Sequence, residues 1–198
     1  MDRSKFDNQL MQLRKIILDG ISYFIAFQAL DREYELSNKN ADYKEGLWWK
    51  YRGFLAPARN ALLKSTLVQL SKVYDTDERT TSLRNLVVEA RNNSDELTPF
   101  ATEDSLEIIQ VRIVQISELL DKLKIYRNKR LVHLDSTDME NLEISDGDIE
   151  VLTDKTKSIF NSFKLLCDGN SDNFDEIMED VKTHSDQIIE MLSKAELG

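Results

Sequence analysis

Apolar residues recur at steps of three or four positions along nearly the whole chain, and this spacing constrains the fold most strongly. The step matches the turn of an α-helix, so each such segment has one face to bury. The most regular run comes from the middle of the sequence: Leu106, Ile109, Ile113, Ile116, Leu120 and Leu123. The chain has only six glycines and two prolines. Since the turns of sheet proteins depend on these residues, the pattern predicts an all-α protein.

The periodic segments predict one helical bundle of five or six helices over residues 1–198. The predicted helices cover residues 2–36, 42–74, 82–91, 102–134, 149–166 and 174–191. Pro57 lacks the amide donor of a helix interior, so we expect it to kink or break the second helix. Thr102 is the predicted N-cap of the fourth helix, and Gly169 is the predicted C-cap of the fifth. Residues 92–101 and 135–146 are predicted loops.

Composition excludes several classes of protein. One cysteine, Cys167, excludes an internal disulfide framework and fits a reducing compartment. The longest apolar stretch, residues 21–30, is too short to span a bilayer, and the N-terminus has no apolar signal core. We therefore expect a cytoplasmic protein without a membrane partner. The net charge of −10 should repel nucleic acid unless a local basic patch overrides it.

Few residues could carry metal or cofactor chemistry. His133 and His184 are the only histidines, and neither has a partner at metal-ligand spacing. The glycines are too dispersed for a phosphate-binding loop. We therefore expect no metal and no cofactor. His184 is interpreted as a partly buried histidine packed between helices. The aromatic cluster of Trp48, Trp49 and Tyr51 is interpreted as core rather than as a platform for stacking bases.

The strongest local anomaly in this acidic chain is a basic cluster between Lys122 and Arg130. Five basic residues occupy these nine positions, where an even distribution would give about one. Such a patch is what a polyanion requires. A basic end of a helix also complements the helix dipole, so the cluster alone leaves both interpretations open.

The sequence from Arg127 to His133 reads Arg-Asn-Lys-Arg-Leu-Val-His and resembles the Arg-x(4–6)-His signature of the HEPN superfamily. The polar residue that usually follows the arginine is present as Asn128. Two upstream pieces, one ending in Tyr74-Asp75 and the other Ser82-Leu83, extend the resemblance to the abortive-infection, AbiU-like branch. The resemblance covers roughly residues 5–190 in helix order.

The resemblance implies a helical protein that forms a homodimer and cleaves RNA without a metal, as antiphage and toxin–antitoxin HEPN endoribonucleases do. His133 would then be the acid and base, since histidine titrates near neutral pH. Arg127 would bind the phosphate, since its charge is permanent and its donors match phosphate oxygens. Asn128 would position the phosphate or the histidine, and Asp135 would orient the imidazole. The residues expected to bind the flanking RNA backbone are Lys122, Lys124, Lys129 and Arg130. An antitoxin protein is a further expected partner.

On an ideal helix, Arg127 and His133 lie 120° apart, because six residues turn the chain by 600°. Three arrangements would still bring them together. The long arginine side chain reaches around the helix, the helix distorts near its end, or the two residues meet across a dimer axis.

Two other functions fit the same sequence. The first is a catalytically inactive HEPN-like module that dimerises or binds a partner, which the acidic net charge favours. The second is a helical regulator that binds nucleic acid without cleaving it. RNA cleavage that needs no metal and is lost in Arg127→Ala and in His133→Ala would support the enzyme over these two alternatives.

Overall fold

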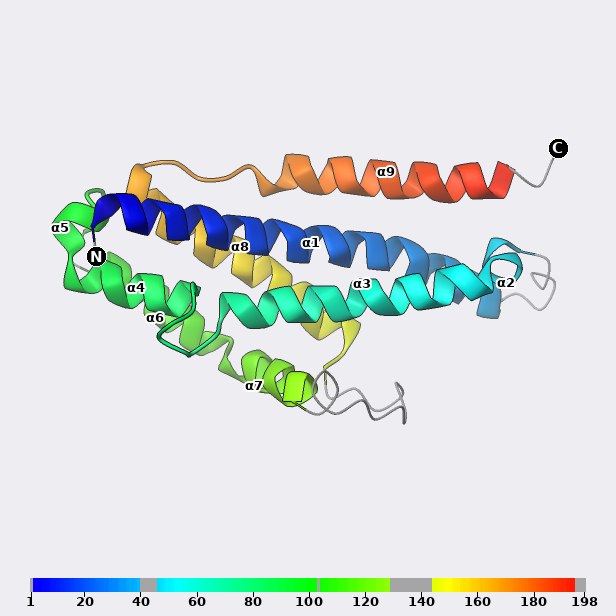
Figure 1. Cartoon of the computed structure of the whole chain (residues 1–198), viewed down its shortest axis with the longest axis horizontal. Coiled ribbons are helices and arrows are strands. Elements are labelled where there is room, and N and C mark those ends of the chain that lie inside the picture. The colour runs from blue at the N-terminus through cyan, green and yellow to red at the C-terminus, as the bar shows by residue number, and fades with distance from the viewer. Residues whose placement is uncertain (1, 40–45, 103, 129–143, 195–198) are drawn as a thin grey trace. The chain divides into compact units, whose positions relative to one another are not determined.

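The computed structural model describes residues 2–39, 46–102, 104–128 and 144–194 (Figure 1). These residues form nine helices and no strand, which confirms the all-α class and raises the helix count above the predicted five or six. The helices are α1 (Arg3–Lys39), α2 (Leu47–Lys50), α3 (Arg52–Val73), α4 (Leu83–Asn92), α5 (Ser94–Leu97), α6 (Ser105–Gln115), α7 (Ser117–Tyr126), α8 (Asp146–Asp168) and α9 (Phe174–Lys194). None of the helices in these ranges is long and apolar enough to cross a membrane.

The predicted helix over residues 102–134 is interrupted at Ile116, which separates α6 from α7. Ile116 leaves helical geometry, with φ −103° and ψ 12°, yet its side chain is only 4% exposed. The apolar spacing therefore marks the buried face correctly on both sides of the interruption. The spacing of apolar residues indicates which side chains are buried. It does not show where the backbone changes direction between them.

Pro57 does not break its helix, so of the two predicted outcomes, a kink or a break, the break is wrong. It lies inside α3, in the second turn, and the helix instead begins anew at Arg52 after α2 ends at Lys50. A proline removes one backbone hydrogen bond, and this loss is tolerated best near the start of a helix.

The region between α4 and α6 also differs from the prediction. The expected loop over residues 92–101 contains the one-turn helix α5. Thr102 is not the N-cap of α6, because Asp104 occupies that position. Thr102 instead bonds Ser105, whose Oγ accepts from the Thr102 backbone N–H at 2.9 Å. Serine and threonine side chains can bond the backbone in several kinds of local turn near a helix start. A threonine there does not by itself identify the N-cap, which is why the prediction for Thr102 was wrong.

Helix α8 has well-defined caps at both ends. Ser145 accepts a hydrogen bond from the backbone N–H of Asp148, and the Asp148 carboxylate accepts one from the backbone N–H of Ser145. This capping box places the helix start at Asp146, three residues before the predicted start. Gly169 ends the helix at φ +74°, which confirms the predicted C-cap.

Replacing Gly169 by alanine is expected to lower the free energy of unfolding by about 1–2 kcal/mol, because a side chain is strained at positive φ. An added Cβ would also lie 3.2 Å from the ring of Phe100. Urea denaturation measures the loss. Gly147→Ala is the matched control, since its nearest neighbour would be Ser145 Oγ at 3.8 Å and its φ is ordinary. An equal loss in the two variants would contradict the role given to Gly169.

The chain divides into two compact units, each of which includes part of α1 and part of α3. The first unit comprises residues 1–18 and 67–172. In its core, the rings of Phe6 and Phe163 meet edge to face with centroids 6.3 Å apart. Helix α6 packs against α4 and α8 within this unit. This unit contains the basic cluster and the two upstream segments of the family resemblance, which end at Asp75 and Leu83.

The second unit comprises residues 19–66 and 173–198. Trp48 is buried there against the ring of Tyr34, at a centroid distance of 5.1 Å, which confirms its predicted place in the core. Trp49 is 40% exposed, so the prediction is wrong for this neighbour. His184 is exposed, contrary to the prediction. Helix α9 buries Phe174 and Ile189 and leaves Ile188 in solvent, so the assumed buried face was misaligned.

Candidate functional site

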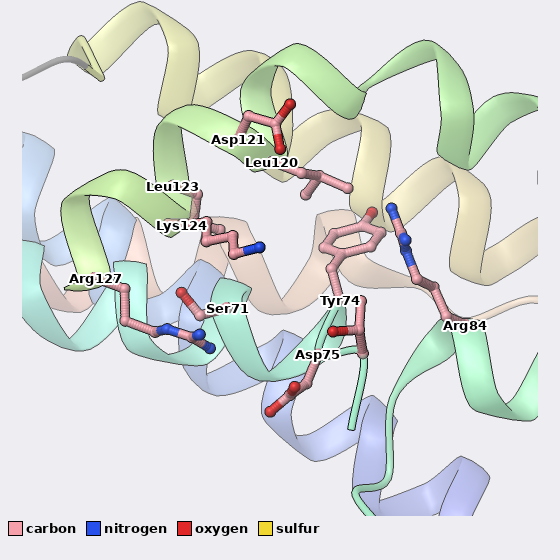
Figure 2. A pocket seen from close by; sticks show the side chains of 10 residues that line it. Ser71, Tyr74, Asp75, Arg84, Leu120, Asp121, Leu123, Lys124 and Arg127 are labelled. Atoms are coloured by element: carbon pink, nitrogen blue, oxygen red, sulfur yellow. The ribbon is translucent and has the colours of Figure 1, made fainter. Parts of the chain in front are cut away.

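A pocket of about 170 Å³ lies in the first unit, where the end of α3, the start of α4 and the face of α7 converge (Figure 2). Its size suits small groups such as phosphates better than a complete drug-sized ligand. The lining side chains carry both signs of charge: Ser71, Tyr74, Asp75, Thr76, Arg84, Leu120, Asp121, Leu123, Lys124 and Arg127.

Helix α3 contributes a polar but uncharged part of the wall. The Ser71 hydroxyl donates to the Leu67 carbonyl at 2.8 Å, so its own helix uses its proton. The Tyr74 hydroxyl lies 2.9 Å from the Thr156 hydroxyl of α8. Burial raises the pKa of Tyr74 to about 12, although the bond to Thr156 and the charge of Arg84 lower it. Tyr74 is therefore a neutral hydroxyl at physiological pH.

Helix α7 contributes two cations, Lys124 and Arg127. They are three residues apart and so project from the same side of the helix. Figure 2 shows both side chains extending from α7 toward α3, with the Arg127 guanidinium near Ser71. Neither side chain forms a hydrogen bond or ion pair within the part of the chain that the structure describes. Both side chains line the pocket.

Lys122 belongs to the same basic cluster but lies elsewhere. Its ammonium is 2.9 Å from the carboxylate of Asp148, at the start of α8. The backbone N–H of Ser145 and the ammonium of Lys122 hold the pKa of Asp148 below its usual range. The charge of Lys122 is therefore already paired, which distinguishes it from Lys124.

Helix α4 contributes Arg84, which the sequence analysis did not select. Arg84 is the second residue of α4 and projects toward Tyr74 in Figure 2. Its Nε is buried and has no hydrogen-bond partner among the described residues. An available signal was the absence of any acidic residue from the first turn of α4, where an acid would complement the helix dipole.

The structure places part of the predicted site. Lys124 and Arg127 line the pocket, and Asn128 is exposed beside them without lining it. Lys129, Arg130, His133 and Asp135 lie outside the described residues. The two upstream pieces also reach the pocket, because Tyr74 and Asp75 line it and Ser82 caps the helix that carries Arg84. Segments that are distant in sequence thus converge at Arg127.

The helix changes its geometry where the motif begins. Residues 127–128 form a wider, π-type turn after α7. Such turns occur often at functional sites. The helix therefore departs from ideal α geometry at the first residues of the motif, whose His133 lies outside the described residues.

Two other chemistries find no support in the described ranges. No group of three or more histidine, cysteine, aspartate and glutamate side chains there is arranged to hold a metal ion. Cys167 is buried, and burial raises the pKa of its thiol to about 12. Because the thiolate is the nucleophile, Cys167 is unreactive in the folded protein.

Comparison with known proteins places the chain in a family. The AbiU2 family model of HEPN proteins matches residues 3–188, which is nearly the whole chain. The chain matches no curated protein and no solved structure.

Proposed function

The chain belongs to the AbiU2 family of HEPN proteins, and on this basis we propose that it is a metal-independent endoribonuclease of abortive infection. The family match confirms the resemblance to the AbiU-like HEPN branch. The observation that carries the proposal is the position of Arg127, whose guanidinium lines a pocket together with Lys124 and has no ion-pair partner among the described residues. A permanent cation in a pocket of this size suits a phosphate group of RNA.

The proposed reaction uses the nucleophile that RNA itself supplies. The ribose 2′-hydroxyl attacks the adjacent phosphorus while His133 accepts its proton. The bond from phosphorus to the 5′-oxygen breaks, and His133 returns a proton to that leaving oxygen. The products are a 2′,3′-cyclic phosphate and a 5′-hydroxyl. Arg127 stabilises the negative charge that develops on the phosphoryl oxygens.

The remaining predicted residues have supporting roles in this proposal. Asn128 positions the phosphate or the imidazole, and Asp135 orients the imidazole. The flanking backbone is bound by Lys124, Lys129 and Arg130, with Lys122 contributing once it separates from Asp148. The protein acts as a cytoplasmic homodimer that an antitoxin protein silences.

One assay tests the proposal directly. Purified protein is incubated with single-stranded RNA in excess chelator, and the ends of the products are identified by mass spectrometry. We expect cleavage with 2′,3′-cyclic phosphate ends, and no cleavage of RNA that is 2′-O-methylated throughout. Absence of cleavage, or cleavage of the methylated RNA, would contradict the proposal.

A second candidate function is a catalytically inactive module that dimerises or binds a partner protein. The observation that favours it is a row of exposed apolar residues three apart on α6: Ile108, Val111 and Val114, exposed by 56%, 49% and 67%. Such rows often mark protein interfaces. Association that Val111→Glu disrupts, in a protein that leaves RNA intact, would favour this module over the enzyme.

A further inference from the structure

The end of the pocket at Arg84 has a feature that the proposed mechanism does not use. Arg84 carries a permanent charge, and its buried Nε donor has no acceptor among the described residues. It forms no ion pair within the described residues, although Asp75 lines the same pocket. Asp75 instead accepts a hydrogen bond from the backbone N–H of Asp77 at 3.1 Å.

The position of Arg84 in its helix adds a second argument. The N-terminus of a helix carries partial positive charge, which makes it a favourable place for an anion and an unfavourable place for a cation. Arg84 lies in the first turn of α4, and no acidic residue in that turn offsets its charge. A buried donor without an acceptor is also costly. An anion bound to the part of the guanidinium that lines the pocket would offset the unfavourable charge at this helix end.

The wall that α7 contributes to the pocket is longer than one phosphate. Leu120 lines one end and Arg127 the other, and seven residues of helix rise by about 10 Å. Figure 2 shows the guanidinium groups of Arg84 and Arg127 at opposite ends, with the Lys124 ammonium between them. Hydrogen bonds from nitrogen to a phosphate oxygen need donor–acceptor distances near 2.9 Å. Two phosphates can therefore occupy the pocket, one at each guanidinium.

We infer that Arg84 binds a second backbone phosphate of the RNA, next to the phosphate that Arg127 holds. This inference rests on the proposed function and narrows its substrate to single strands with at least two consecutive phosphates. Lys124 lies between the two phosphates and contacts the strand that joins them. Tyr74, which is neutral and bonded to Thr156, forms the floor beside Arg84.

Oligonucleotides of defined length test the inference through cleavage. The substrates are a dinucleotide with one phosphate and two trinucleotides with two phosphates, all ending in hydroxyl groups. In each trinucleotide, 2′-O-methylation leaves only one of the linkages cleavable. We expect Arg84→Ala to lower kcat/KM about tenfold or more on at least one trinucleotide, and to leave the dinucleotide unchanged. Equal losses on all three substrates, or no loss on either trinucleotide, would overturn the inference.

A binding measurement keeps this result separate from the proposed function. Fully 2′-O-methylated dinucleotide and trinucleotide cannot be cleaved, so their dissociation constants report the phosphate sites even in a protein without nuclease activity. We expect Arg84→Ala to weaken binding of the trinucleotide alone. If the trinucleotide binds no more tightly than the dinucleotide to the unaltered protein, there is no second phosphate site.

Two variants serve as controls for fold and charge. Arg91→Ala removes an exposed arginine from the other end of α4, where it bonds Gln110. It should leave the dissociation constants of the dinucleotide and the trinucleotide unchanged. Asp121→Asn removes an exposed negative charge from the pocket wall and should tighten trinucleotide binding.

Should Arg84→Ala fail to fold, as judged by circular dichroism, Arg84→Lys replaces it. Lysine keeps the charge but lacks the paired donors, so a smaller loss confined to the trinucleotide is expected.

Discussion

Alanine in place of Arg127 is expected to lower the rate of RNA cleavage by about 100-fold or more, because the variant loses the cation that stabilises the transition-state phosphate. His133→Ala should lower it by a similar or greater factor, since general acid–base catalysis contributes about 10²–10⁴-fold. Both rates are measured in excess chelator under single-turnover conditions. The two losses should be far from additive in the double variant, because the residues act on one step.

The structure supplies a matched control for the arginine. Arg91→Ala removes the same charge from the same unit, far along the chain from Arg127, and should cleave RNA at the unaltered rate. The Arg127 side chain forms no hydrogen bond or ion pair with the described residues, so its loss should leave the denaturation midpoint in urea unchanged. Cleavage by Arg127→Ala at the rate of Arg91→Ala would remove Arg127 from the mechanism.

The class of the fold was predictable because it depends on averages over many residues. Apolar spacing and the scarcity of glycine and proline both favoured helices throughout. Local signals with one dominant cause were also reliable, such as Gly169 at positive φ. The failures concern places where packing overrides a local preference. Ile116 is buried in a break that nothing nearby in the sequence predicts, and Pro57 is accommodated inside α3.

The candidate site was predictable only in part, for a similar reason. Lys124 and Arg127 stood out because their charges are close together in the sequence. Arg84 is more than 30 positions away from the basic cluster, and only the folded chain brings it to the pocket. The sequence also did not show which lysines of the cluster form ion pairs. Lys122 pairs with Asp148, whereas Lys124 lines the pocket. Charge counts show where a patch is, whereas the contacts decide which charges remain available.

Replacement of Phe163 by alanine should produce the largest loss of stability, about 3–5 kcal/mol in the free energy of unfolding. Phe163 is fully buried on α8, where its ring meets that of Phe6 at the N-terminal end of the chain. The variant loses the burial of a large side chain, and it gains a cavity that a rigid core fills only in part. Urea denaturation followed by circular dichroism measures the change.

Phe54→Ala is the control for this loss, because Phe54 is 69% exposed and its replacement should change stability by about 0.5 kcal/mol or less. Typical single domains are stable by about 5–15 kcal/mol, so Phe163→Ala is expected to remove a large part of the stability of the first unit and to lower its midpoint of thermal unfolding. Cleavage should then fall because Tyr74 and Thr156, which connect α3 to α8 beneath the pocket, lose their fixed positions. A small loss, equal to that of Phe54→Ala, would mean that α8 does not anchor the core on which the pocket rests.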